Sequence, residues 1–332
     1  MKFPDIIPRL ASIRVRPLWV LSRRCVSSSS ARFSDDSSSN NDRGNETEEI
    51  LLRHLVPAVV GHHSLASEPH GKHTCREQYV SVLTLNQPTK YNPLSLGVLN
   101  LLEKELQKAE SEFPRCRCVV VKAAPGKAFS AGHDMKEIHS YLQRKDEGSI
   151  RQLFETCSRV MKAFQSIRPV TIASVDGIAT AAGCQLIAAT DLAIATKASR
   201  FALSGIHNGL VCSTPIVAVS RNIASRKHAL EMLLTGDFID ADRAFKYGLV
   251  NEVVQDSNEL EASTMRLAQK IMQHPSYAVT RGKDLFYKQY KMKTTDAYIC
   301  ATDQIVEDIV NSEEAREGIG AFVEKRKPKW QS

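Results

Sequence analysis

The sequence contains no apolar run of the roughly 18–20 residues that a membrane-spanning helix needs. The apolar run around Leu186–Ala195 is interrupted by Asp191, so it is better interpreted as a buried helix followed by a strand. The P-loop and G-x-G-x-x-G phosphate-binding patterns are also missing. The sequence therefore predicts neither a membrane-spanning helix nor a nucleotide-phosphate loop of either kind.

None of the eight cysteines belongs to a C-x-x-C pair, and they are scattered along the chain. We expect free thiols that pack as small apolar side chains. Cys116 and Cys118 alternate along an expected strand, which places both thiols on one face and favours packing over redox chemistry. One further group has ligand types at metal-like spacing but no complete zinc pattern, so we expect no metal site: His62, His63, His70, His73 and Cys75.

The net charge of +7 is concentrated in residues 1–34, where seven basic residues and one acidic residue give +6. The remainder carries only +1, so no nucleic-acid partner is expected. Residues 1–34 are also rich in arginine and serine, as mitochondrial transit peptides are. We therefore predict targeting to the mitochondrial matrix by residues 1–34, with a disordered basic tail as the alternative.

The rest of the chain divides into three predicted parts. Residues 35–77 are expected to form a disordered or poorly ordered linker, because residues 34–48 are polar, low in complexity and aperiodic. A short helix near Glu48–Val56 is the one element considered there. The folded body should begin near Gln78, with an α/β core over residues 78–256 and a helical region over residues 257–332.

Strand-like and helix-like segments alternate through the predicted core. The strands are continuous apolar runs, which is typical of a parallel sheet covered by helices: Tyr79–Leu85, Cys118–Lys122, Val170–Val175 and Leu192–Thr196. Two core helices are expected, Leu94–Ala109 and Ile150–Ile167, the second with Phe154 among the residues of its apolar face. After about residue 256 only helical patterns follow: Glu259–Gln273, Pro275–Tyr290 and Thr295–Phe322.

Two loops of small residues carry the strongest chemical signal. Residues 127–138 and residues 176–191 each lead from a short apolar strand into a helix. Two such loops can direct backbone N–H groups at one carbonyl oxygen, which is how an oxyanion hole is built. The alternative is that the residues are small only because the strand-to-helix turns are tight.

The order of motifs resembles the enoyl-CoA hydratase/isomerase (crotonase) family over about residues 78–330. The matching segments are Leu85–Leu94, Ser130–Asp134, Asp176–Leu186, Leu234–Gly236, Tyr247–Val250 and Glu317–Lys327. The resemblance implies an α/β fold, the crotonase (ClpP-like) spiral of ββα units with a C-terminal helical trimerisation region. It also implies a homotrimer or hexamer.

The family holds a thioester oxygen with two backbone N–H groups, which match those of His133 and Ala182 here. The two glutamates that family hydratases use for proton transfer match Gln185 and Gly205, and neither of these can exchange a proton at neutral pH. The aspartate of dienoyl isomerases matches Ser213. Ordinary hydratase or isomerase turnover is therefore not expected.

Coenzyme A, as part of the substrate and not as a separate cofactor, is implied to lie against Lys90, Tyr91 and Ala131. Lys325 matches a lysine that the family directs toward the coenzyme A of a neighbouring subunit. We expect several polar residues near the loops to line the acyl pocket: the His133 side chain, Ser204, His207, Asn208 and Cys212. For each of them the alternative is an ordinary loop or core residue.

The sequence therefore predicts a mitochondrial acyl-CoA-binding protein of fatty-acid metabolism with an oxyanion hole but without the hydratase glutamates. Two alternatives stay open: a non-catalytic acyl-CoA-binding regulator of lipid metabolism, and a decarboxylase or hydrolase acting on an acyl-CoA. Plain enoyl-CoA hydratase activity would require Gln185 to suffice.

Overall fold

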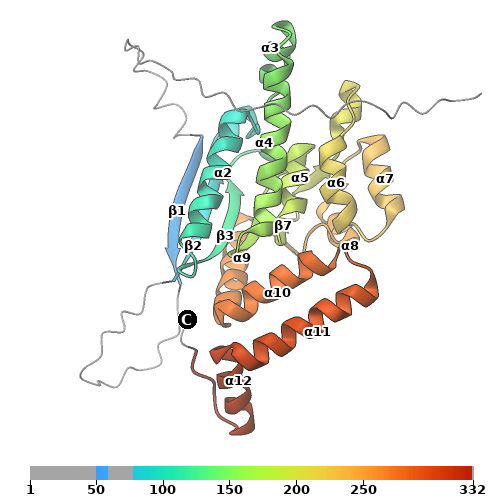
Figure 1. The fold of residues 1–332 in the computed structure, drawn as a ribbon. Helices are drawn as coiled ribbons and strands as arrows, with labels where there is room; N and C mark the ends of the chain where they lie inside the picture. The colour runs from blue at the N-terminus through green and yellow to red at the C-terminus, as the bar shows by residue number, and fades with distance from the viewer. Residues whose placement is uncertain (1–49, 59–77, 331–332) are drawn as a thin grey trace, which may run out of the picture. The chain divides into compact units, whose positions relative to one another are not determined.

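The computed structural model describes residues 50–58 and 78–330 (Figure 1). The strands are β1 (Leu51–Pro57), β2 (Tyr79–Leu85), β3 (Cys116–Ala123), β4 (Ala128–Ser130), β5 (Val170–Val175), β6 (Ile178–Thr180), β7 (Leu192–Thr196), β8 (Arg200–Ala202), β9 (Ile239–Asp240) and β10 (Glu252–Val254). The helices are α2 (Leu96–Ser111), α3 (Met135–Gln143), α4 (Glu147–Ser166), α5 (Ala182–Ala189), α6 (Ser213–Asn222), α7 (Arg226–Thr235), α8 (Ala241–Tyr247), α9 (Ser257–Met272), α10 (Ser276–Gln289), α11 (Thr294–Asn311) and α12 (Glu313–Val323), with short 3-10 helices η1 (Pro88–Lys90) and η2 (Ser204–Asn208).

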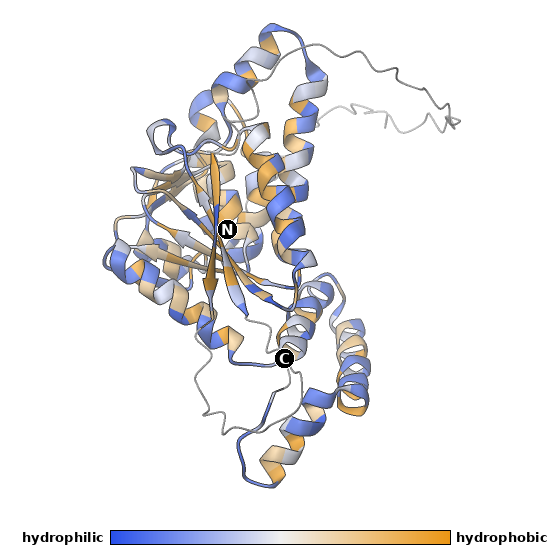
Figure 2. Ribbon diagram, turned by 90° about the vertical axis from the view of Figure 1, so that its left-hand side faces the viewer, coloured by the Kyte–Doolittle hydropathy of each residue, from blue (hydrophilic) through white to orange (hydrophobic). Residues whose placement is uncertain are grey.

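The main sheet has the strand order β1-β2-β3-β5-β7-β10, and its strands from β2 to β10 pair in parallel. Side chains alternate between its two faces, so Val119 and Val121 pack with α2, α4 and α5 while Val120 packs with α9. Figure 2 shows the apolar strands lying between helices whose outer sides are polar. The predicted helix-covered parallel sheet is confirmed, and burial on both faces explains why its strands show no polar alternation.

A second sheet, of order β4-β6-β8-β9, is built from short strands that each follow a strand of the main sheet. The chain passes from β3 to β4 to α3, from β5 to β6 to α5, and from β7 to β8 to η2 and α6. These are the predicted ββα units. Because β4 and β6 are parallel neighbours, the loops that leave them emerge side by side.

The prediction that the folded body begins near Gln78 is wrong, as is the helix near Glu48–Val56. Residues 51–57 form β1, which pairs antiparallel with β2 along its whole length. Arg53 fixes it there, with ion pairs of 3.3 Å to Glu105 and 2.5 Å to Glu112. The local pattern of apolar residues does not predict this pairing, because the two glutamates lie far along the chain, on α2 and directly after it.

The expectation that Cys116 and Cys118 share one face is also wrong. The pairing of β2 with β3 shifts between Tyr79 and Val80, so Arg117 is an extra residue in β3. Cys116 therefore packs on the α2 side and Cys118 on the α9 side. Burial raises the pKa of both thiols to about 12, so they remain protonated packing groups.

Helix α10 is docked onto the core by a buried ion pair. Lys283 Nζ lies 2.7 Å from Asp191 Oδ2 and also donates to the carbonyl oxygens of Phe164 and Pro169. Tyr287 donates to the other carboxylate oxygen of Asp191 at 2.8 Å. One polar cluster thus joins the C-terminal helices to the start of β7.

The helical pattern expected over Thr295–Phe322 is divided into α11 and α12. The break is at Ser312, whose backbone is extended and whose hydroxyl accepts from the Ala315 N–H at 3.1 Å. A serine that caps one helix ends the helix before it, which the apolar periodicity alone does not show.

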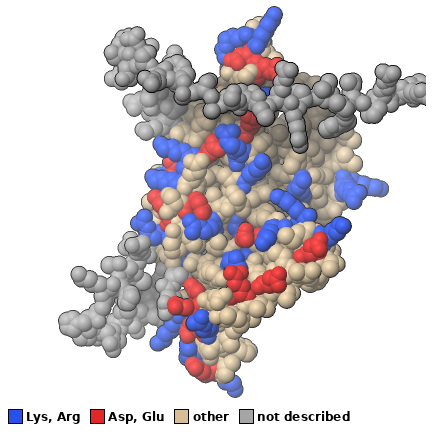
Figure 3. All heavy atoms as spheres, in the orientation of Figure 1, with Lys and Arg blue, Asp and Glu red and all other residues tan. Residues whose placement is uncertain are grey.

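Other predictions lie outside the described residues: the targeting segment 1–34, most of the linker, and the histidine-rich segment from His62 to Cys75. Across residues 50–58 and 78–330, no helix is long and apolar enough to cross a membrane. The same residues contain no cluster of three metal-ligand side chains. On the face seen in Figure 3, basic and acidic side chains lie interspersed.

Candidate functional site

The first loop leaves β4 and enters α3 along a path that has room only for small side chains. Gly132 has φ +89°, and a Cβ there would lie 3.0 Å from the Thr180 carbonyl oxygen and 3.1 Å from the Ala182 nitrogen. Asp134 caps α3 by accepting from the N–H groups of Lys136 and Glu137. The first loop is therefore held against the second loop and not merely near it.

The second loop leaves β6 and enters α5 with the same tightness. Ala181 has φ 48° and ψ −116°, an unusual conformation for a residue with a side chain. A Cβ on Gly183 would lie 2.3 Å from the Ser130 carbonyl oxygen, and the Thr180 hydroxyl donates to the Ala131 carbonyl at 2.9 Å. Backbone of the two loops is thus in direct contact.

The two predicted donors, the N–H groups of His133 and Ala182, lie at this contact. Ala182 is the first residue of α5, where an N–H has no partner within the helix. No hydrogen bond joins either N–H to another residue in the described part of the chain. Ala182 is buried and His133 is half-buried.

The two residues that match the family glutamates, Gln185 and Gly205, lie on α5 and η2, the elements that follow β6 and β8. Gln185 is 4% exposed on α5, and its Oε1 is 4.0 Å from the Cys157 sulfur on α4. Gly205 lies in η2 with its N–H 3.2 Å from the Cys212 sulfur. Its φ is not in the left-handed region, but a Cβ would lie 2.8 Å from that sulfur and 3.0 Å from the Leu210 carbonyl oxygen.

The residues predicted to hold coenzyme A adjoin the first loop. Ala131 N–H donates to the carbonyl of Tyr91 at 2.9 Å, and Leu94 N–H donates to the carbonyl of Gly132 at 2.8 Å. Tyr91 is 48% exposed with φ 62°, and Lys90 precedes it at the end of η1. Lys90, Tyr91 and Ala131 are therefore brought together, with Tyr91 open to solvent.

Lys325 is not part of this group. It follows α12 with φ 53°, and its N–H donates to the Phe322 carbonyl. No hydrogen bond or ion pair links it to the loops among the described residues. Its predicted role toward a neighbouring subunit remains a prediction.

The other predicted pocket residues gather in and just after η2. Ser204, His207 and Asn208 belong to η2, and His207 Nε2 lies 3.0 Å from the Thr235 carbonyl oxygen. Cys212 is buried and precedes Ser213, the first residue of α6. The His207 side chain is therefore engaged with the end of α7, where it stabilises the loop.

The two nitrogens of the His133 imidazole have different surroundings, which the sequence does not predict. Nδ1 lies 3.1 Å from the Leu94 carbonyl oxygen, whereas Nε2 is buried without a hydrogen-bond partner among the described residues. Burial lowers the pKa of the imidazole, and the bond to Leu94 opposes this only in part. The ring is therefore neutral, with its proton on Nδ1 and a free lone pair on Nε2.

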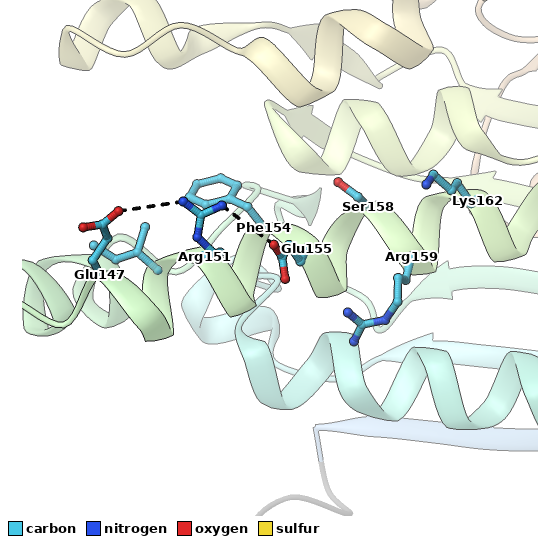
Figure 4. Close-up of a pocket in the computed structure, with 8 residues that line it drawn as sticks. Glu147, Arg151, Phe154, Glu155, Ser158, Arg159 and Lys162 are labelled. Atoms are coloured by element: carbon cyan, nitrogen blue, oxygen red, sulfur yellow. Dashed lines mark ion pairs between the residues drawn. The ribbon is translucent and has the colours of Figure 1, made fainter. Parts of the chain in front are cut away.

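Phe154 of α4 packs edge-on against this imidazole, with ring centroids 4.9 Å apart and an interplanar angle of 72°. It is half-buried and also lines a groove of about 600 Å³ along α4 (Figure 4). Arg151 lies between two glutamates of the groove at 3.8 and 3.9 Å. The groove is lined by Glu147, Ile150, Arg151, Phe154, Glu155, Ser158, Arg159 and Lys162.

The sequence profile of the enoyl-CoA hydratase/isomerase family matches residues 76–332. The chain belongs to this family. It is 40% identical over 275 residues to the mitochondrial enoyl-CoA hydratase domain-containing protein 3 of Mus musculus, covering 82% of this chain and 89% of the mouse protein. The human protein of the same name is 39% identical over 265 residues, covering 80% and 84% of the two chains.

Solved structures of family members confirm the crotonase fold. The human enoyl-CoA hydratase domain-containing protein 3 superposes with a TM-score of 0.71 at 39% identity, over 76% of this chain and 96% of that one. An enoyl-CoA hydratase of Mycobacterium smegmatis gives 0.72 at 44% identity, over 76% and 95%. The family resemblance is confirmed, and the curated relatives are named mitochondrial, in agreement with the predicted compartment.

Proposed function

We propose that the protein binds acyl-CoA thioesters and holds the thioester oxygen with the N–H groups of His133 and Ala182. The observation that carries this is the interlocked pair of loops, in which neither N–H group bonds to any of the described residues. A buried N–H needs an acceptor, and a polarised carbonyl oxygen supplies one. Lys90 and Tyr91, beside the first loop, are the groups we assign to coenzyme A.

Hydration of enoyl-CoA is not part of this proposal. Gln185 is turned toward Cys157 in the core, and Gly205 has no side chain, so neither residue transfers a proton to or from water. The protein thus acts in mitochondrial fatty-acid metabolism by binding acyl-CoA, without ordinary hydratase turnover. Residues 1–34, with a balance of +6, and the names of the relatives support the compartment.

The assembly we propose is a homotrimer or a hexamer formed through the C-terminal helices. Their outward residues include many large apolar side chains that are about half exposed or more. Such a surface is rare on a monomeric soluble protein and marks an interface. The residues are Phe286, Tyr290, Tyr298, Ile299, Ile305, Val306, Ile309, Val310, Ile319, Phe322 and Val323.

The experiment compares butyryl-CoA with S-butyl-CoA, a thioether of the same chain that lacks the carbonyl oxygen. Butyryl-CoA should raise the melting temperature by linkage, and the thioether should bind about tenfold or more weakly, because two N–H groups lose their acceptor. Equal affinity would show that the loops do not hold the carbonyl. No binding of any CoA ester would contradict the acyl-CoA function itself.

A further inference from the structure

A buried histidine nitrogen beside the two loops lacks a partner, and the proposed function does not use it. The Nε2 atom of His133 is buried and makes no hydrogen bond to the described residues. Buried polar side-chain atoms in folded proteins are nearly always hydrogen-bonded, because losing the bond to water is costly. An acceptor left open in this place therefore calls for a donor from outside the chain.

The other ring nitrogen fixes what that donor must be. Nδ1 lies 3.1 Å from the Leu94 carbonyl oxygen, which can only accept, so the proton of the neutral ring is on Nδ1. Nε2 is then an acceptor and cannot donate. Its ligand must carry an O–H or N–H group, which excludes purely hydrocarbon acyl chains as the best fit.

The position of the ring places that group close to the thioester. The backbone N–H of His133 is one of the two donors that we assign to the thioester oxygen. The imidazole belongs to the same residue, so a ligand of Nε2 belongs near the thioester end of the acyl chain and not near its far end. Gly132 and Asp134, the cap of α3, hold this residue on either side.

Phe154 separates the imidazole from the groove on α4. Its ring packs edge-on against the His133 ring, with centroids 4.9 Å apart. The same side chain lines the groove on α4 (Figure 4). Phe154 is half-buried. Ser158 and Lys162, which line the same groove, form neither a hydrogen bond nor a ring contact with the imidazole. Because Phe154 contacts both the imidazole and the groove, a rotation of this one side chain is the change that would connect them.

We propose that His133 is a specificity-determining residue: with Phe154 turned aside, its Nε2 accepts a hydrogen bond from a hydroxyl or amide group on the first carbons of a bound acyl chain. This inference rests on the proposed acyl-CoA function. It names a substrate class, acyl-CoA esters with a donor group near the thioester. No bond is made or broken in this recognition.

The test measures dissociation constants by calorimetry at pH 7.5 for butyryl-CoA and its 3-hydroxy, 4-hydroxy and 3-fluoro derivatives. At least one hydroxy ester should bind about tenfold more tightly than butyryl-CoA, because it satisfies a buried acceptor. The fluoro ester should show no such gain, because fluorine cannot donate. Equal binding of hydroxy and parent esters, or a matching gain for the fluoro ester, would overturn the proposal.

Variants then assign the effect to the imidazole. His133→Phe keeps the backbone N–H and an aromatic ring but removes the acceptor, so the ratio of hydroxy-ester to butyryl-CoA affinity should fall to about one, whatever the absolute affinity for butyryl-CoA. His133→Gln, with an amide oxygen as acceptor, should restore part of the preference. Ser158→Ala, a hydroxyl removed from the same groove, is the matched control and should leave the preference unchanged.

Phe154→Ala tests whether the Phe154 ring controls access to the imidazole. Removing the ring should speed the association of all the esters and keep the hydroxy preference. A preference that survives His133→Phe would show that another group recognises the hydroxyl. The ligand series on the wild-type protein decides the proposal even if a variant folds poorly, and loss of binding to every ester would contradict the acyl-CoA function instead.

Discussion

The surroundings of Gly205 limit whether a glutamate for acid–base chemistry can be introduced at this position. A Cβ there would lie 2.8 Å from the Cys212 sulfur and 3.0 Å from the Leu210 carbonyl oxygen. A glutamate at this position is therefore opposed by these two contacts and not by the backbone conformation, which is an ordinary one. Cys212→Ala removes the nearer obstacle, and the remaining contact needs a shift of only a few tenths of an ångström.

This gives a prediction for the missing carboxylates. The wild type should hydrate crotonyl-CoA near background, since acid–base groups commonly contribute about 10²–10⁴-fold each. Gln185→Glu with Gly205→Glu and Cys212→Ala should raise hydration by about tenfold or more. The same variant with Gly205→Gln is the control of equal shape and should not respond. Wild-type turnover equal to that of an active hydratase would refute the argument.

His133 should also make stability depend on pH. The ordinary pKa of the imidazole is 6.5, and burial lowers the pKa in the folded protein. As pH falls below about 6.5, the unfolded chain takes up the proton first, so the free energy of unfolding decreases by about 1.4 kcal/mol for each unit of pKa lowering. Stability is therefore full above pH 6.5 and is lost toward the lower folded-state pKa.

Replacing the imidazole should remove this dependence. We expect the wild type to lose more stability than His133→Gln between pH 7.5 and pH 5, as measured by urea unfolding at each pH. Parallel curves for the two proteins would show that His133 contributes nothing to the loss.

Among the elements, α10 carries a buried ion pair to the core that can be tested by itself. The side chains of Lys283 and Asp191 are only 9% and 11% exposed. Lys283→Met should lower the free energy of unfolding by about 3 kcal/mol, because it leaves the carboxylate without its cation while Thr171 and Tyr287 still donate to it. Lys288→Met, on the exposed side of the same helix, should change stability little. Similar losses for the two variants in denaturant titration would exclude a special role for the pair.

The first strand, β1, should be required for solubility. It covers the edge of β2, and an uncovered apolar edge strand pairs with other chains. A chain that begins at residue 78 should aggregate at concentrations where one that begins at residue 49 stays dispersed in light scattering. Equal behaviour would mean that the β2 edge is protected in another way.

Some elements follow from their local sequence, whereas others depend on partners far along the chain. Tyr79–Leu85 and Val170–Val175 were predicted to the residue, because strands buried on both faces are continuous apolar runs. The sequence does not predict a strand at residues 51–57, because its place depends on the ion pairs of Arg53 with Glu105 and Glu112, which no local pattern shows. The extra residue Arg117 was missed for the same reason, since a bulge depends on the partner strand.

The site divides in a similar way. The glycine-rich loops and their contact follow from small residues at two strand ends, and the sequence located both. The tautomer of His133 and its contact with Phe154 depend on Leu94 and on α4, which only folding brings to the ring. The apolar spacing of α4 placed Phe154 in the core, whereas it is half-buried beside the groove.

For the whole molecule, the exposed apolar surface of α11 and α12 predicts self-association. Phe322 is 84% exposed and Val323 is 72% exposed. Phe322→Asp should lower the molar mass measured by light scattering after size-exclusion chromatography, because a charge buried in an interface without a partner is costly. Leu142→Asp, at a residue 58% exposed on α3, is the control and should keep the wild-type mass. A wild-type protein that elutes as a monomer would contradict the proposed assembly.

The close contact of Gly183 with Ser130 bears on how a lineage of such chains can diverge. A side chain at residue 183 would begin 2.3 Å from a backbone oxygen, so substitution there is opposed by the need to fold at all. Residues 185 and 205 take no part in that contact. Selection for a foldable chain alone therefore preserves the contact between the two loops, whatever side chains stand at residues 185 and 205.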